Sequence, residues 1–218
     1  WLLDESPLKY DKHLFAHRGN GQKPIMQFVN NEWEEAEFVT DDIEKNVADG
    51  KHYRDHMILS RSVYAARKIE AACISKKIPY IVFGGTTLMR SAHVRDVVSA
   101  LRILANFRDE LAWMRYLMLW QGVGEVSASK IIEKMFSYAS LGECIDAVKS
   151  AKLREHAAHE LLQKICTLEK RPDAAIDIIV SELDGIMARK HENWDARKKD
   201  FTALKIVAKR ADSISTFI

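Results

Sequence analysis

The chain has 218 residues, of which 47% are hydrophobic and 29% charged, a profile typical of a folded globular protein rather than a disordered one. Its formal net charge of +2 does not indicate nucleic-acid binding, so any such surface must come from local clustering of basic residues. Three widely spaced cysteines exclude a disulfide framework and fit a reducing cytosol, and no apolar run or leader predicts a membrane span or a signal peptide. The chain begins at Trp1 rather than methionine, and we expect it to be a piece of a longer protein.

The first part of the chain predicts strands and helices in alternation. Residues 1–20 have no sustained period and are expected to form an irregular lead-in. Three short apolar runs predict strands, at residues 24–30, 56–61 and 79–84. Two amphipathic patterns predict helices between them, at residues 32–50 and 63–77. This β-α-β-α-β order is typical of a parallel layer with right-handed crossovers, so residues 21–88 are expected to form a small α/β portion.

After residue 88 the pattern changes, and nearly every segment has a helical period. Helices are predicted at residues 93–107, 109–120, 128–139, 141–151, 155–170, 172–190 and 194–218. The fold class expected from the whole chain is therefore mainly α, with a partial parallel layer followed by an all-helical part.

Most familiar catalytic and metal-binding patterns are missing. The chain has no G-x-x-x-x-G-K-[ST] segment for nucleotide phosphates and no recognisable nucleophile, so no catalytic residue and no cofactor site are predicted. His156 and His159 share a helix face, but a third ligand is not evident, and two solvent-facing histidines are the better interpretation. Basic clusters along the later helices are interpreted by default as solvated faces neutralised by nearby carboxylates.

Two glycines surround Val123 between two predicted helices. Glycine accepts positive φ, so Gly122 and Gly124 could simply form a tight turn. The same geometry would leave the first N–H groups of the next helix pointing outward, where the helix dipole favours a phosphate. The local pattern leaves both interpretations open. The residues expected to contact a phosphate are Gly122, Val123, Gly124, Glu125, Val126, Ser127 and Lys130, with Ser129 as a further hydroxyl and the Glu125 charge in opposition.

A series of short elements follows in a fixed order over residues 53–132. These are Arg61, Arg67 with Glu70, Ile78–Tyr80, Gly84 with Gly85, Ala92–Asp96, Leu101–Asn106, Asp109, Trp113 with Arg115, and Gly122–Gly124. Each element is weak alone, but the ordered series resembles the UvrD/Rep/PcrA family of DNA helicases. Val63 departs from that pattern where many relatives carry Asn, and Phe107 where Pro is common.

The resemblance implies a division of the chain and a role for it. Residues 21–88 would be part of the second RecA-like motor domain (2A), residues 89–190 the helical 2B accessory subdomain, and residues 191–218 a helix leading back to the motor. In relatives the G-x-G turn grips the duplex backbone, and the segment of Arg61 lies near the single-stranded track. The parent would be an ATP-dependent 3′–5′ DNA helicase that needs ATP and Mg²⁺, while this fragment would be non-catalytic and regulatory.

The resemblance implies two partners: DNA, as a duplex or a single/double-strand junction bound without sequence preference, and the remaining motor domains of the same helicase. It also implies a cytoplasmic, nucleoid-associated protein without a membrane partner. A hypothesis of a different class stays open beside it. The helical part could be a protein-interaction module whose glycine turn is purely structural, with Trp113, Trp120 and Trp194 suited to such a surface.

Overall fold

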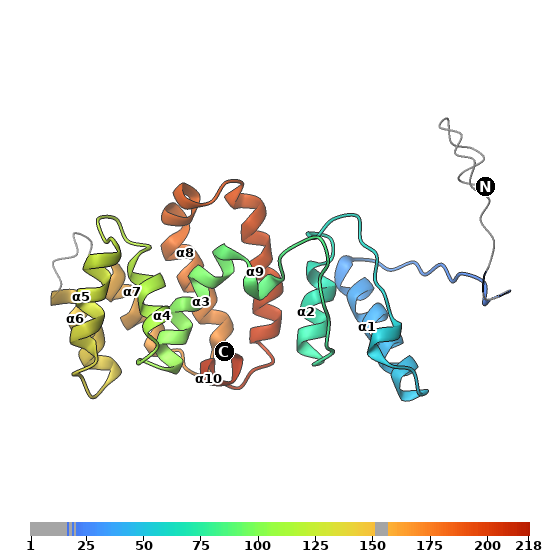
Figure 1. Cartoon of the computed structure of the whole chain (residues 1–218), viewed down its shortest axis with the longest axis horizontal. Helices are drawn as coiled ribbons and strands as arrows, with labels where there is room; N and C mark the ends of the chain where they lie inside the picture. Colours follow the sequence, from blue (N-terminus) through green and yellow to red (C-terminus); the bar gives the residue numbers. More distant parts are fainter. Residues whose placement is uncertain (1–16, 18, 20, 151–156) are drawn as a thin grey trace. The chain divides into compact units, whose positions relative to one another are not determined.

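In the computed structural model, which describes residues 17, 19, 21–150 and 157–218, every regular element is a helix (Figure 1). The chain divides into two compact units, the first ending at Asn30 and the second spanning Asn31–Ile218. The predicted lead-in over residues 1–20 lies outside the described residues apart from His17 and Gly19. All the helices described belong to the second unit.

The first two predicted helices are confirmed as α1 (Glu32–Ala48) and α2 (Arg67–Ser75), with a short 3₁₀ turn, η1 (Tyr53–Asp55), between them. The Asn31 side chain caps α1 by accepting hydrogen bonds from two backbone N–H groups at 3.0 Å each. Gly50, with φ of +97°, follows the end of α1. The two helices pack together through a small apolar cluster made of Ala36, Ile43, Ile69, Ala72, Cys73 and Ile78.

The predicted parallel layer is not seen in the part of the chain that the structure describes, where no strand is formed. The three apolar runs that predicted strands remain irregular, and their large side chains are exposed: Ile25, Met26, Phe28, Met57, Ile58, Leu59, Ile81 and Phe83. A strand exists only when its N–H and C=O groups find a neighbouring strand. The alternation of the sequence identified segments suited to a sheet, but it could not supply the pairing.

The remaining helices largely follow the sequence prediction. They are α3 (Ala92–Ala105), α4 (Glu110–Leu117), α5 (Glu125–Met135), α6 (Leu141–Ser150), α7 (Ala157–Cys166), α8 (Pro172–Lys190), α9 (Trp194–Ala208) and α10 (Ile214–Phe217), preceded by the 3₁₀ turn η2 (Leu88–Arg90). The last predicted helix is thus two helices. Helices α4 to α9 pack each against the next, and α3 also packs against α4, α8 and α10 around a large apolar core (Figure 1).

A buried polar network joins α2 to this core. Its centre is Arg67, whose guanidinium bonds the Glu70 carboxylate at 2.8 Å, the Thr86 carbonyl at 2.9 Å and the Ser91 hydroxyl at 3.0 Å. On α9, Asp200 lies 3.4 Å from Arg67 Nε and bonds His93 of α3 at 3.0 Å. Charges removed from water are stable only when paired, so Arg67 holds α2, α3 and α9 in one arrangement.

A second buried carboxylate, Asp96 on α3, bonds residues at the connection between α8 and α9. Arg115 donates to it at 2.6 Å, and Lys190 and His191 reach its other oxygen at 2.9 and 3.0 Å. The helices connect through Asn193 in the left-handed region, at φ of 55°. The "A-H-V-R-D" element of the sequence is therefore a structural one, since both His93 and Asp96 make interhelical contacts.

Replacing Asp96 with Asn should lower the free energy of unfolding by about 2–3 kcal/mol, because three cationic or polar partners lose a buried carboxylate. Urea unfolding followed by circular dichroism measures the change. The matched control is Asp177→Asn, which removes an exposed carboxylate paired with Lys205 and should cost less than about 1 kcal/mol. Equal losses for the two variants would show that Asp96 does not have this role.

Gly85 lies against Val63, and a Cβ built at Gly85 would meet Val63 Cγ2 at 2.4 Å. Gly85→Ala should therefore destabilise the fold by about 1–3 kcal/mol through overpacking, and Val63→Ala in the same chain should recover part of that loss. Gly142→Ala is the control, since its nearest neighbour is 3.9 Å away. Thermal unfolding of the four proteins tests the contact, and a Gly85→Ala variant as stable as the parent would contradict it.

Candidate nucleic-acid interface

The connection between α4 and α5 places Val123 inward and its two glycines outward. The Val123 N–H donates to the Trp120 carbonyl at 3.2 Å, and its side chain is buried in the large core. Gly122 has φ of +84°, a conformation that side chains rarely adopt. The tight-turn interpretation thus accounts for Gly122.

Gly124 has a different reason to be glycine. It is the N-cap of α5 with φ of −95° and ψ of 175°, an extended conformation open to any residue. A Cβ at this position would meet nothing within 4 Å. Neither the backbone nor the packing of the chain requires glycine here. Glycine is accepted at an N-cap, and its missing side chain also allows close approach of an outside group.

The start of α5 presents unpaired backbone donors to solvent. Gly124 has no side chain to cap the helix, and the N–H groups of Glu125, Val126 and Ser127 have no acceptor among the described residues. All four residues are exposed. The helix dipole adds partial positive charge at the same place, so the geometry suits an anion.

Two further side chains extend this end of α5. Lys130 is exposed and forms no ion pair within the part of the chain described, and it follows Ser127 by three residues, on the same helix face. Glu125 is exposed in the first turn and opposes an anion there, whereas Ser129 is half-buried. The structure thus brings together the turn residues, Ser127 and Lys130.

Arg61 is not brought to this site. It is exposed in an irregular segment before α2, and α2 packs mainly against α1 and α9, whereas α5 packs against α4 and α6. Val63, two residues after Arg61, contacts Gly85 through its side chain.

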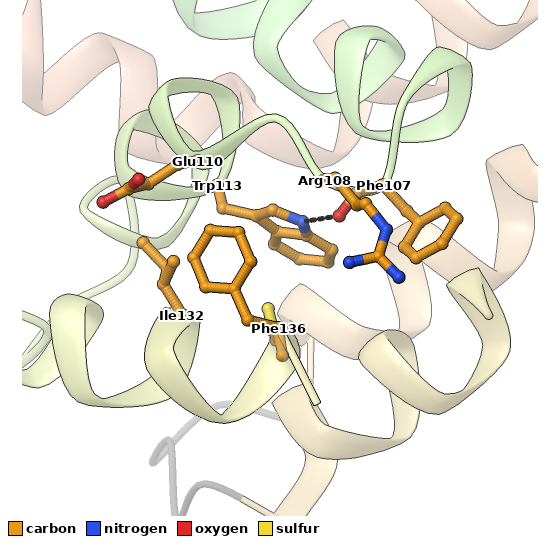
Figure 2. A pocket seen from close by; sticks show the side chains of 7 residues that line it. Phe107, Arg108, Glu110, Trp113, Ile132 and Phe136 are labelled. Carbon is orange, nitrogen blue, oxygen red and sulfur yellow. Dashed lines mark hydrogen bonds between the residues drawn. The ribbon is translucent and has the colours of Figure 1, made fainter. Parts of the chain in front are cut away.

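A shallow, open pocket lies beside α5, between it and the segment that leads into α4 (Figure 2). The Trp113 indole N–H donates to the Phe107 carbonyl at 2.8 Å, and the Arg108 guanidinium lies 5.3 Å from the Phe107 ring centroid. Ile132 and Met135 of α5 form the opposite wall together with Phe136, which follows α5. These contacts fix α5, and hence the N–H groups at its start, against α4.

Other candidates from the sequence have structural roles. Trp113, Trp120 and Trp194 are all buried, so they do not provide an interaction surface. Lys164 and Lys198 pair with carboxylates at 2.6 and 3.0 Å, as expected for solvated basic faces. His159 is buried rather than solvent-facing, His156 lies outside the described residues, and no group of ligands in the described ranges could hold a metal.

The sequence model of the UvrD-like helicase C-terminal domain matches residues 2–210, nearly the whole chain. The chain belongs to this family. Over 115 residues it is 32% identical to the ATP-dependent DNA helicase Rep of Escherichia coli K12, which is 52% of this chain and 17% of that protein. Over 121 residues it is 33% identical to the ATP-dependent DNA helicase PcrA of Staphylococcus aureus Mu50, 55% of this chain and 17% of that protein.

The family match covers both the glycine turn and the buried networks around Arg67 and Asp96. The aligned part is about a sixth of the relatives' length, so their activities are not transferred with it. Among the described helices of this UvrD-like domain, none has the length and apolar character needed to cross a bilayer.

The two glycines of the turn should respond differently to alanine. Gly122→Ala should cost about 1 kcal/mol or more, because it forces a side chain into positive φ, whereas Gly124→Ala should lose only the smaller preference of an N-cap for glycine over alanine, about 0.5 kcal/mol. Urea unfolding of the two variants beside the parent measures this difference. A large loss for Gly124→Ala would mean that the fold itself requires this glycine.

Proposed function

We propose that this UvrD-like domain is a non-catalytic, DNA-binding and regulatory part of an ATP-dependent 3′–5′ DNA helicase, and that it contacts duplex phosphates through the start of α5. The observation that carries the proposal is the run of exposed residues from Gly124 to Ser127, whose helix N–H groups have no acceptor among the described residues. The relatives' names, ATP-dependent DNA helicases, support DNA as the partner.

The chemistry at the turn would be simple. Backbone N–H groups of Glu125, Val126 and Ser127 donate to phosphate oxygens, the Ser127 hydroxyl adds a donor, and Lys130 supplies charge. Because Gly124 carries no side chain, the backbone of the duplex approaches the helix start closely. None of these groups reads a base edge, so binding would be sequence-independent and sensitive to salt.

The division of the chain completes this proposal. Residues 21–88 would belong to a RecA-like 2A domain, residues 89–190 to the 2B subdomain, and residues 191–218 to the path back to the motor. The exposed apolar runs of the first region would then form strands against the rest of the sheet, supplied by the remaining motor domains. ATP and Mg²⁺ would be bound by motor residues outside this chain, which has no phosphate-cradling motif.

A protein-interaction role is the second candidate, and the exposure of three large side chains favours it. Leu111 on α4, Val126 on α5 and Phe136 after α5 are exposed by 76%, 70% and 49%. A partner that covers these apolar side chains would gain by their burial. In that case α5 would bind a protein partner, and added DNA would not displace that partner.

Binding to a fluorescent hairpin with a single-stranded 3′ tail tests the first candidate. Gly124→Glu with Lys130→Glu should weaken binding at least about tenfold, and the slope of log K against log salt should fall by about one for the lost lysine contact. Fluorescence anisotropy at two salt concentrations measures both quantities.

The matched control is Gly185→Glu with Lys209→Glu, which makes the same two substitutions at exposed positions on α8 and at the end of α9. It should bind as the parent does, with all three proteins folded by circular dichroism. Equal binding by the two double variants would contradict phosphate binding at the start of α5 and favour the protein-interaction role.

A further inference from the structure

The pocket between the segment that leads into α4 and the last turns of α5 has an apolar floor (Figure 2). Trp113, Ile132 and Met135 form this floor and are buried, whereas Phe136 lines the pocket at its rim and stays half-exposed. The pocket therefore offers apolar surface that a bound side chain would remove from water, which is favourable. It is called the α4–α5 pocket, and its remaining rim residues are charged.

Two charges of opposite sign line the α4–α5 pocket. Arg108 is exposed, and its guanidinium lies against the Phe107 ring, 5.3 Å from the centroid. Glu110 is exposed as well, and within the part of the chain described neither side chain pairs with an opposite charge. Figure 2 shows Arg108 and Glu110 on opposite sides of Trp113. The rim is thus positive on one side of the apolar floor and negative on the other.

We propose that the α4–α5 pocket docks an extended segment of a partner protein in which an apolar side chain lies between an acidic and a basic one. Alternate side chains of an extended segment point to the same face, so three of them can meet the pocket together. The apolar side chain covers Phe136 and the floor, the acidic one pairs with Arg108, and the basic one pairs with Glu110.

The two rim charges select this occupant over others. A wholly acidic segment places a like charge beside Glu110, and a wholly basic segment places one beside Arg108. Glu110 opposes a DNA strand in the same way, because every phosphate is negative. The pocket is shallow and the contact small, so the docking is weak and reversible.

This docking site goes beyond the proposed function and does not depend on it. The unpaired N–H groups lie in the first turn of α5, whereas Ile132 and Met135 lie towards its other end. Between Val126 and Met135 the helix rises about 13 Å, which leaves room for a phosphate and a protein segment at the same time. The site shares Phe136 with the protein-interaction role considered above, but it does not require Leu111 or Val126.

Titration of the 218-residue chain against fluorescein-labelled peptides, followed by anisotropy, tests the proposal. The first probe is the mixed peptide Ser-Asp-Ser-Leu-Ser-Lys-Ser, and two others carry either Asp or Lys at both charged positions. The parent should bind the mixed peptide about fivefold more tightly than the other two, because each of those brings one like charge to the rim. Replacing the leucine of the mixed peptide with serine should weaken binding about tenfold, since the apolar contact is lost.

Reversing one rim charge should change which peptide is preferred. Arg108→Glu should favour the peptide with two lysines over the mixed one by about fivefold, and Glu110→Arg should favour the peptide with two aspartates to the same extent. The matched control is Glu192→Arg with Lys209→Glu, which makes both charge reversals at exposed positions outside the pocket and should keep the preference of the parent.

Folding of the variants is checked by thermal unfolding, because the Glu110 charge also lies in the first turn of α4, where it interacts favourably with the helix dipole. Glu110→Gln is the milder second variant. It should bind the mixed peptide and the peptide with two aspartates within about twofold of each other, because it removes the repulsion without reversing it.

Three results would overturn the docking site: equal binding of the three peptides by the parent, no binding at about 1 mM peptide, or the parent's preference retained in Arg108→Glu and in Glu110→Gln. Hairpin binding that is lost in Arg108→Glu, with no peptide bound by the parent, would overturn it in favour of DNA at this pocket. The Gly124→Glu, Lys130→Glu variant should keep the peptide preference of the parent. Failure of phosphate binding at the start of α5 is therefore distinguished from failure of the docking site.

Discussion

The buried guanidinium of Arg67 is the contact on which the arrangement of the helices depends. The chain has two apolar clusters, a small one within and just after α1 and α2 and a large one that lies mainly within the later helices and also includes Ala71 of α2. Arg67 connects them by bonding Glu70 on its own helix and approaching Asp200 on α9, which in turn holds His93 on α3. A buried charge that loses a partner is costly, so these helices keep one arrangement.

The α5 turn shows how two glycines in one short motif can have unrelated physical reasons. Gly122 is required by its positive φ, and Val123 fixes the turn by burying its side chain. Gly124 has an ordinary conformation and open space around it, so neither its backbone nor its packing requires glycine, and its missing side chain leaves the helix start open to an outside group. Packing against Trp113 and the neighbouring pocket holds α5 in place, which orients the unpaired N–H groups before any ligand arrives.

Sequence periodicity predicted the helices well because their apolar residues recur at helical spacing, which is visible within each segment. Helix α8 was predicted over its full length from Pro172 to Lys190, since proline at the first turn and basic residues at the last mark both ends. The prediction of strands was not met because a strand needs a second segment to pair with, and an apolar pattern within one segment does not provide that partner strand. The ordered motifs indicated the family that the match shows, but His93, Asp96 and Arg67 proved to make interhelical contacts, which no spacing could reveal.

The sequence by itself determined the helical character of the chain, the position of the G-x-G turn, and the ordered motifs of the UvrD-like family, because all three are encoded in residues close together along the chain. Only the tertiary structure decided that Gly124 is free of internal constraint, that Arg61 lies apart from the turn, and that the tryptophans are buried. Only the tertiary structure showed that Lys68 and Lys199, 131 residues apart in the sequence, both lie over the ring of Tyr64. The physical reason is that burial, ion pairing and ring contacts depend on distances in space, and packing between helices sets those distances independently of separation in sequence.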